Sequence, residues 1–502
     1  MDLSPKVIYN DYNNKDLNKS SATEQLISLI ENADVNTTIE SIKILGIIKA
    51  NNNKVFKILE NLLISDSHEQ IRCIAAKALY QNFLDKAFEP MKLLEPMKFA
   101  LLHENSVNCL ITIIETLGEI NNKLSNSLLI DKLNNIENQK YKNNFNLLFK
   151  SKNIEGSELA EIVKNSIIID HLQNRFDRVS FELNYGLVSE LDLSNVSSHL
   201  FRRNTLKTLP EYLSSLTNLK KLDLKINRLS SLPDTIGSLT SLRFLDLSYN
   251  KLRLLPSTLG NLSSLKYLYL RYNDLKSLPN SIGLLQSLEI LDLRVNKLAT
   301  INNAITNLAS LEILDLHGNQ LNSLPESLSN LTSLKQLKLG LNHLTILPEW
   351  FIDLNSLEIL GLGGNQFFSN LPEWIGSLHS LKHLELFDNN YTQIPEALGS
   401  LSSLEVLNLR NNRIKDLPKS MKSLKLLKKL NLSWNNLTTL PEWLDSLSSL
   451  EELNLWGNKI EVLPESISSL KALKFLNLTF NRIEEIPDFL RDLQNLGLII
   501  KI

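Results

Sequence analysis

Cysteine is nearly absent from this chain of 502 residues, which has only Cys73 and Cys109. Two cysteines cannot supply a disulfide framework, and their scarcity suits a reducing compartment. An excess of charge of one sign is also missing, because residues 1–180 hold 21 Lys and Arg against 23 Asp and Glu, and residues 181–502 hold 32 against 32. Neither part has the basic excess that phosphate neutralisation requires, so we expect no nucleic-acid partner.

Long apolar segments and catalytic motifs are missing as well. No segment reaches the roughly 18 uncharged apolar residues of a membrane span, and the N-terminus has no apolar signal core. No phosphate-binding loop of the form G-x-x-x-x-G-K-[ST] occurs, and His317, His343 and His383 lie at different positions of the repeat described below, so they cannot converge on one metal ion. We therefore expect a cytoplasmic protein that has no membrane span, binds no metal or cofactor, and is not an enzyme.

What the chain has instead is a repeat, marked by one recurring asparagine. The interval between these asparagines is 23 residues except between Asn365 and Asn389, where it is 24. Each unit follows the pattern Leu311-x-x-Leu314-x-Leu316-x-x-Asn319-x-Leu321-x-x-Leu324-Pro325. The asparagines are Asn227, Asn250, Asn273, Asn296, Asn319, Asn342, Asn365, Asn389, Asn412, Asn435, Asn458 and Asn481.

The hydrophobic period changes within each unit. The alternation Leu314-x-Leu316 is typical of a short strand with one buried face, whereas Leu328, Leu331 and Leu334 have the spacing of a helical turn. Twelve of the fifteen prolines lie at the switch between the two, where a fixed φ and a missing N–H suit the start of a helical turn. One unit cannot cover its own leucines, so the units must stack into a solenoid with a parallel sheet.

This pattern resembles the leucine-rich repeat, and its Leu-Pro step and 23-residue length resemble the intracellular Ras-group class. The resemblance implies an α/β repeat solenoid over residues 188–502, a horseshoe of about 12 or 13 repeats with the sheet on its concave face. It also implies a non-catalytic protein-binding role, which in the Ras-group class is often in small-GTPase signalling. The recurring asparagine follows the strand, where its amide can bond both donors and acceptors of the turn backbone.

The front of the chain has a helical pattern, and we expect an all-α domain there. Residues 66–79 and 103–120 have apolar side chains at helical spacing, in a layout that resembles HEAT-type helical pairs. We assign residues 1–21 to a flexible N-terminus, 22–135 to HEAT-like repeats, 136–187 to a linker and N-terminal cap, and 188–502 to the leucine-rich repeats. The first strand, residues 188–196, is followed by an insertion, and residues 496–502 form an apolar edge strand without an obvious cover.

The phase of the repeat predicts which side chains line the concave face. These are the residues between and just after the two strand leucines, and they include aromatic side chains and arginines, the commonest interface anchors. The charged residues could instead pair between strands, and the tryptophans could pack on one another. The asparagines between the two strand leucines of the later units could bond from repeat to repeat; these are Asn408, Asn431, Asn454 and Asn477. We expect a partner to bind at Tyr249, Tyr269, Arg271, Tyr272, Arg294, His317, Gly340, Gly361, Gly363, Phe387, Arg410, Trp434, Trp456 and Phe480.

Residues 359–374, ILGLGGNQFFSNLPEW, depart from the repeat by three glycines and by one extra residue. The glycines imitate a nucleotide-binding loop, but no long helix follows that could hold a phosphate. We expect them to lower the floor of the concave face so that a partner's loop can enter, with a neutral substitution as the alternative. The extra residue is expected to push Phe367 or Phe368 outward, and Trp350 and Trp374 to pack together on the outer side.

These features predict a scaffold or adaptor that binds a partner protein on its concave face, with a second partner on the helical region. The Ras-group resemblance implies a small GTPase or its regulator as that partner. One alternative is a regulatory or substrate-recruiting subunit of a separate enzyme. Another is self-assembly through residues 496–502, although we expect a monomer.

Overall fold

The computed structural model describes residues 4–84, 90–198, 201–367, 370–495 and 497–502. They form two compact units, and each is described by itself. The first comprises Met1–Leu191, Ser197–Arg203 and Pro210–Leu219, and the second comprises Asp192–Val196, Asn204–Leu209 and Lys220–Ile502. Within the described residues, no helix is both long and apolar enough to cross a membrane.

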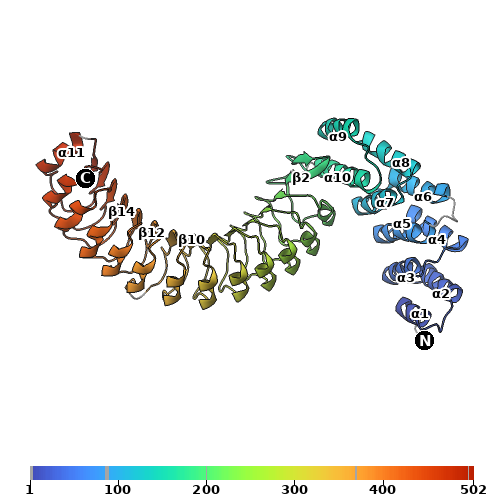
Figure 1. Cartoon of the computed structure of the whole chain (residues 1–502), viewed down its shortest axis with the longest axis horizontal. Coiled ribbons are helices and arrows are strands. Elements are labelled where there is room, and N and C mark those ends of the chain that lie inside the picture. The colour runs from blue at the N-terminus through green and yellow to red at the C-terminus, as the bar shows by residue number, and fades with distance from the viewer. Residues whose placement is uncertain (1–3, 85–89, 199–200, 368–369, 496) are drawn as a thin grey trace. The chain divides into compact units, whose positions relative to one another are not determined.

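The first unit is helical, with ten α-helices among its described residues (Figure 1). They are α1 Pro5–Asn13, α2 Lys19–Asn32, α3 Val35–Ile47, α4 Asn53–Ser65, α5 Glu69–Phe83, α6 Pro90–His103, α7 Val107–Ile120, α8 Lys123–Asn134, α9 Gln139–Ser151 and α10 Gly156–Arg175. Side-chain oxygens of Asn18, Asp34 and Asn52 accept backbone N–H groups at the starts of α2, α3 and α4. Helices that are not consecutive in the chain pack through buried aliphatic side chains, with α3 on α5, α5 on α7 and α7 on α10.

Helix α1 lies in the segment that the sequence analysis assigned to a flexible N-terminus, and that assignment is wrong for residues 5–13. The side chain of Ser4 caps the helix by accepting the N–H of Val7, and Pro5 occupies the first turn, where a missing N–H costs nothing. Ile8 is only 1% exposed. Burial of this side chain against the unit anchors a helix whose composition is otherwise polar.

The first unit also contains a hairpin of β1 Ser180–Asn184 and β2 Leu187–Asp192. Tyr185 and Gly186 join the strands and both have positive φ, as a two-residue hairpin turn requires. The buried Asn165 of α10 accepts the N–H of Val188 through its side-chain oxygen at 2.9 Å. The insertion expected after the first strand contains a small two-stranded sheet of β3 Ser197–Ser198 and β4 Phe201–Thr205.

The second unit is a solenoid whose three-residue strands lie in one parallel sheet in chain order. Figure 1 shows β10, β12 and β14 on the inner side of this arc and the short helices on its outer side. The strands are β5 Lys221–Asp223, β6 Phe244–Asp246, β7 Tyr267–Tyr269, β8 Ile290–Asp292, β9 Ile313–Asp315, β10 Gln336–Lys338, β11 Ile359–Gly361, β12 His383–Glu385, β13 Val406–Asn408, β14 Lys429–Asn431, β15 Glu452–Asn454, β16 Phe475–Asn477 and β17 Ile499–Lys501.

A short 3₁₀ helix follows the recurring proline of each coil, or Asn302 in the coil of η5, as the change of period predicts. These helices are η1 Glu211–Ser215, η2 Asp234–Ser238, η3 Ser257–Asn261, η4 Asn280–Leu284, η5 Asn303–Asn307, η6 Glu326–Asn330, η7 Glu349–Asp353, η8 Glu373–Ser377, η9 Glu396–Ser400, η10 Lys419–Ser423, η11 Glu442–Ser446, η12 Glu465–Ser469 and η13 Asp488–Leu490, with η1 in the first unit. A last helix, α11 Arg491–Asn495, follows η13. The strand leucines, such as Leu314 and Leu316, are fully buried between the two layers.

The recurring asparagine bonds the backbone of adjacent coils, as predicted. Asn319 donates to the carbonyl oxygens of Leu293 and Leu316 at 3.0 and 2.9 Å, and its side-chain oxygen accepts the N–H of Leu298 at 3.1 Å. The side chain is 5% exposed, so each of these backbone groups would be buried without a partner if the amide were absent.

The extra residue between Asn365 and Asn389 does not push Phe367 outward, so this prediction is wrong. Phe367 is 2% exposed and its ring stacks on that of Tyr391 at 6.1 Å. It stands two residues after the recurring asparagine, at the position where other coils place a core leucine. The other residue named in the prediction, Phe368, lies outside the described residues.

Candidate functional site

Four columns of side chains cover the concave face of the second unit, because strand residues alternate between the core and the solvent. We name them by their place in the coil. The leading column precedes the first strand leucine, the middle column lies between the two leucines, the trailing column follows the second, and the turn column comes next. In the coil of β9 these are Ile313, Asp315, His317 and Gly318.

The middle column carries mostly Asp and Asn, and these side chains serve the backbone of their own coil. Each accepts the N–H of the residue two positions later, at distances from 2.8 to 3.2 Å. Among the described residues of this column, only Asn408 donates to an adjacent coil, at Glu385, so amide bonding from repeat to repeat is wrong for the other asparagines. The residues that accept in this way are Asp223, Asp246, Asp292, Asp315, Asn408, Asn431, Asn454 and Asn477.

The turn column has a left-handed backbone in the coils of β5 to β16, with φ between 51° at Val295 and 71° at Gly457. Large side chains rarely adopt this conformation, yet Tyr249, Tyr272 and Trp434 do. The neighbouring coils favour it, since the N–H of every turn-column residue from Ile226 to Gly457 bonds the next coil, as Trp434 does to the carbonyl of Trp456 at 2.7 Å. The left-handed backbone of the turn column was not predicted from the sequence, although the glycines in this column indicate it.

The aromatic side chains at the C-terminal end pack on one another and also face solvent. The rings of Trp434 and Trp456 meet edge to face at 5.0 Å, and Phe480 lies 6.1 Å from Trp456. Trp434 is nevertheless 46% exposed and Phe480 71% exposed. Mutual packing and a large exposed apolar area therefore occur together here.

A second aromatic group lies near the start of the solenoid. Tyr249 and Tyr272 stack face to face, with centroids 4.5 Å apart and planes 9° apart. The guanidinium of Arg271 lies 5.4 Å from the centroid of Tyr249, which is a cation–π contact. Tyr269 lies 5.4 Å from Phe244 of the leading column.

Charged side chains in the next coils form a small network. Arg294 contacts Asp292 at 3.0 Å and Asp315 of the adjacent coil at 3.3 Å, so ion pairing between strands occurs at this site. Burial raises the pKa of Asp315 to about 6, and burial with the nearby Arg294 lowers the pKa of His317. Arg410 is exposed beyond this network.

The glycines do not leave the recess that the sequence analysis expected above Gly340 and Gly363. A Cβ on Gly340 would lie 2.7 Å from Nδ1 of His317, and one on Gly363 would lie 2.5 Å from the ring of Phe387. Side chains of neighbouring coils therefore fill the space, which is why these positions exclude a side chain. Gly361 differs, since its nearest neighbour would be Lys338 at 3.5 Å.

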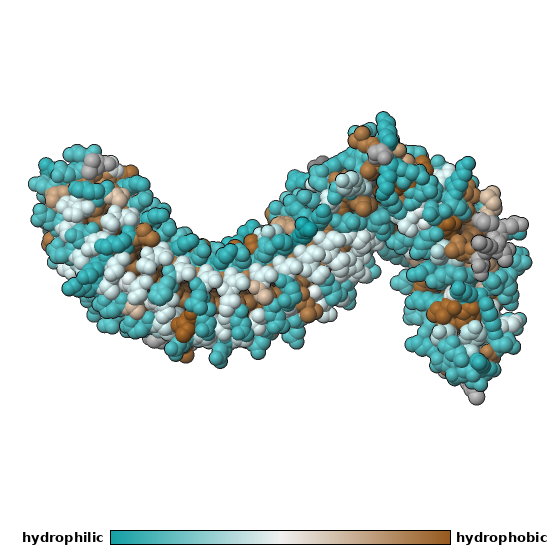
Figure 2. All heavy atoms as spheres, viewed as in Figure 1, coloured by the Kyte–Doolittle hydropathy of each residue, from teal (hydrophilic) through white to brown (hydrophobic). Residues whose placement is uncertain are grey.

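The predicted residues thus share one face but form separate groups. They extend from β6 to β16, ten strand steps of about 4.8 Å, or roughly 50 Å. On the face of this unit visible in Figure 2, hydrophobic residues are scattered among hydrophilic ones rather than gathered into one band.

The leading column is not among the residues predicted from the sequence to bind a partner, yet it is partly exposed on the same face. Half-buried Phe244, Tyr267, Ile290 and Ile313 stand in register on β6 to β9 and make an apolar stripe across four strands. Farther along, Val406 and Phe475 line a shallow depression of about 210 Å³. The available signal was the β-branched or aromatic residue that precedes the first leucine of many coils.

The outer tryptophans do not stack on each other directly. Phe351, which is fully buried, has Trp350 4.5 Å from its ring centroid and Trp374 at 5.6 Å, both nearly parallel to it. The expected packing of two neighbouring coils is therefore made through a third ring, which ties these side chains to the core.

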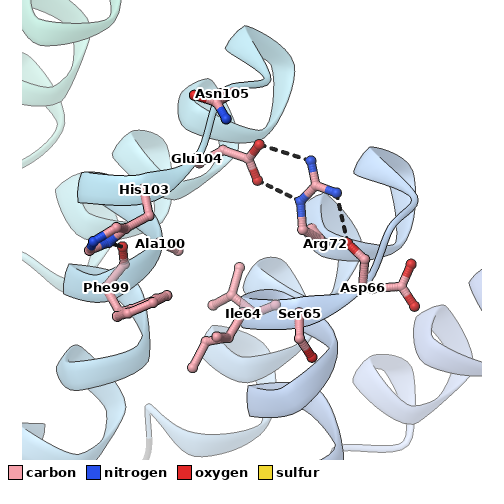
Figure 3. A pocket seen from close by; sticks show the side chains of 10 residues that line it. Ile64, Ser65, Asp66, Arg72, Phe99, Ala100, His103, Glu104 and Asn105 are labelled. Carbon is pink, nitrogen blue, oxygen red and sulfur yellow. Dashed lines mark hydrogen bonds and ion pairs between the residues drawn. The ribbon is translucent and has the colours of Figure 1, made fainter.

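The first unit contains a pocket of about 250 Å³ between α4, α5 and α6 (Figure 3). Arg72 on α5 holds Glu104 through two hydrogen bonds of 2.6 and 2.8 Å and also donates to the carbonyl of Asp66 at the end of α4. Burial acts to raise the pKa of Glu104, but hydrogen bonds from Arg72 and Ser106 lower it to about 2. Arg72 and Glu104 are paired with each other, so their evident role is to join the helices.

Short parallel strands backed by one-turn helices at a 23-residue period define a class of repeat solenoids that present one face for binding. A family model described as a leucine-rich repeat region matches residues 184–375 and 369–461, and a model of two leucine-rich repeats matches residues 448–492. The chain belongs to the leucine-rich repeat family. Proteins of this family generally act by binding other proteins.

Solved structures agree with this assignment. A leucine-rich repeat protein of Leptospira interrogans is 35% identical, with a TM-score of 0.54, over 60% of this chain and 82% of that one. A TDR receptor is 29% identical, with a TM-score of 0.54, over 62% of this chain and 55% of its own. An internalin of Listeria monocytogenes, InlF, is 24% identical, with a TM-score of 0.55, over 64% of this chain and 91% of its own, and it shares the fold. Comparison with curated proteins gave no match.

Proposed function

We propose that this chain is a non-catalytic scaffold or adaptor whose concave face binds a partner protein. The observation that carries the proposal is the exposure of Trp434, Phe480, Tyr249 and Tyr272 on that face. Tyrosine and tryptophan are the commonest interface anchors, and the backbone of the turn column presents these side chains in a fixed conformation at low entropic cost.

The partner that we propose is a small GTPase or a regulator of one, in the cytoplasm, bound to a monomer of this chain. The Leu-Pro step and 23-residue length, which resemble the Ras-group class, support this choice. The helical first unit, with its HEAT-like layout, would hold a second partner. The alternative is a regulatory or substrate-recruiting subunit, in which case the bound partner is an enzyme whose activity this chain alters.

The test is capture of partners from a lysate of the source organism, with GDP and with a non-hydrolysable GTP analogue. The Trp434→Ala/Trp456→Ala variant is expected to weaken capture by more than about 2 kcal/mol without unfolding the solenoid. Trp443→Ala is the matched control, because this tryptophan lies on the outer helix η11.

A partner that depends on GTP and is lost only from the double variant would support both the concave site and the GTPase. Retention of the partner by the double variant would remove these tryptophans from the site. An activity of the captured partner that changes on binding would favour the regulatory subunit.

A further inference from the structure

Charge is distributed unevenly along the second unit, although the whole chain is nearly neutral. Residues 206–276 hold eleven Lys and Arg against five Asp and Glu, a net charge of +6. Residues 277–502 hold 19 against 24, a net charge of −5. The first coils are therefore a basic segment that the average over residues 181–502 conceals.

Five of these basic residues lie in the loops that follow the strands, and all five are exposed. We call them the basic rim: Lys207, Arg228, Lys251, Arg253 and Lys276. Backbone bonds place the loops in register, since the N–H of Arg228 bonds the carbonyl of Leu206 at 3.0 Å and the N–H of Lys251 bonds that of Leu229 at 2.9 Å. Their side chains therefore follow one another along one edge of the solenoid.

The hydrogen bond from Lys297, and to a smaller extent the charges of Arg253 and Lys251, lower the pKa of Asp274, but no carboxylate of the described residues pairs directly with the basic rim. Within the described part of the chain, none of its five side chains has a carboxylate oxygen within 4.0 Å. The acidic residue of these loops, Asp274, pairs with Lys297 instead. Elsewhere on the unit, by contrast, lysines pair with glutamates of adjacent coils, as Lys335 does with Glu312 and Lys428 with Glu405.

The stacked rings of Tyr249 and Tyr272 border the basic rim, since Tyr249 stands two residues before Lys251 and Tyr272 two before Asp274. They are 43% and 46% exposed, so a ligand that lies along the rim also meets an aromatic surface. Leu254, beside Arg253, is 60% exposed and adds an apolar contact.

We propose that the basic rim and the stacked tyrosines bind a short acidic segment of a partner protein. This inference rests on the proposed function and specifies the chemistry of the partner at one end of the solenoid. The rim crosses three steps between coils, roughly 15 Å, which about four or five extended residues span. A short segment fits better than a nucleic acid, because a long polyanion that continued along the solenoid would meet the coils of net charge −5.

The test uses fluorescence anisotropy with the full chain and two labelled ten-residue peptides. One peptide alternates Asp and Glu with Gly and Ser, and the other carries Asn and Gln in place of the acids. We expect the acidic peptide to bind and the amide peptide not to bind. Binding should weaken as NaCl rises, since contacts between exposed charges are screened over about 10 Å at ordinary salt.

The chain offers a matched pair of variants for this test. Lys251→Glu/Arg253→Glu reverses two charges of the basic rim, and Arg413→Glu/Lys415→Glu reverses the same two positions of a later coil. The first variant should weaken acidic-peptide binding by about tenfold or more, and the second should leave it within about twofold. Equal weakening by both variants, or equal binding of both peptides, would overturn the proposal.

A labelled oligothymidylate serves as the nucleic-acid probe. If it binds more tightly than the acidic peptide and is lost in Lys251→Glu/Arg253→Glu, the acidic-segment assignment is wrong. The Trp434→Ala/Trp456→Ala variant should bind the acidic peptide normally. Failure of partner capture can therefore be distinguished from failure of the basic rim.

Discussion

At the scale of single residues, the neighbouring coils determine whether a glycine of the concave face leaves room for a side chain. Gly340 and Gly361 are both buried and lie on adjacent coils, yet only the first is tightly enclosed. A Cβ on Gly340 would lie 2.9 Å from the carbonyl oxygen of Gly363 as well as 2.7 Å from His317, and the backbone oxygen cannot rotate away.

Gly340→Ala should therefore lower the free energy of unfolding of the second unit by about 1–3 kcal/mol through overpacking. Gly361→Ala is the matched control, because its Cβ would make only ordinary contacts, and it should be neutral or should stabilise by up to about 1 kcal/mol. Urea denaturation followed by tryptophan fluorescence measures both. Equal effects of the two substitutions would contradict the enclosure of Gly340.

The sequence predicted which residues face outward, because the alternation of leucines with other residues determines the side of the sheet. It could not predict that His317 and Phe387 cover the glycines, since a rotamer depends on the shape of the adjacent coil. The same limit applies to Phe367, whose buried ring follows from its place two residues after Asn365. The prediction that Phe367 points outward considered only the extra residue and not this core position in the repeat.

At the scale of elements, the ion pair between Arg72 and Glu104 joins helix α5 to the loop before α7. Glu104 is 4% exposed, and its pKa of about 2 lies below its usual value of 4.5. A carboxyl group whose pKa is lower in the folded state stabilises the fold fully above its unfolded pKa. That stabilisation is lost as the pH falls from about 4.5 toward 2.

Glu104→Gln should therefore destabilise the first unit by on the order of 3 kcal/mol at neutral pH, and the difference from wild type should fall by more than half near pH 3. Denaturation followed by far-UV circular dichroism at the two pH values measures this. Glu158→Gln is the control, since its pair with Lys152 is about half exposed and worth under about 1 kcal/mol. A difference from wild type that did not change with pH would contradict the role of the ion pair.

Strands and turns of the second unit were predictable because one pattern recurs in every coil. The packing partners of α4 to α7 were not, since helical periodicity shows which face is buried but not which helix covers it. The Arg72–Glu104 pair joins residues 32 positions apart, and no local spacing indicates such a pair. The left-handed backbone of the turn column was predictable only in part, because glycine marks it in only three coils, at Gly318, Gly364 and Gly457.

At the scale of the whole molecule, the chain divides into two compact units of different construction. The first is built mainly of α-helices that each pack on several others, and the second of coils that bond to adjacent coils. Stability in such a solenoid is approximately a sum of coil and interface terms, so a defect in one coil affects the array and not a remote domain. We therefore expect the two units to unfold in separate transitions.

Two probes separate these transitions. All five tryptophans lie in the second unit, so fluorescence reports its unfolding, whereas far-UV circular dichroism follows mainly the helices of the first. Leu316→Ala, at a fully buried strand position, should cost about 2–5 kcal/mol and shift only the fluorescence transition. Glu104→Gln should shift only the transition seen by circular dichroism. A single transition seen by both probes and shifted by both variants would mean that the units unfold together, and each stability change predicted here would then apply to the whole chain.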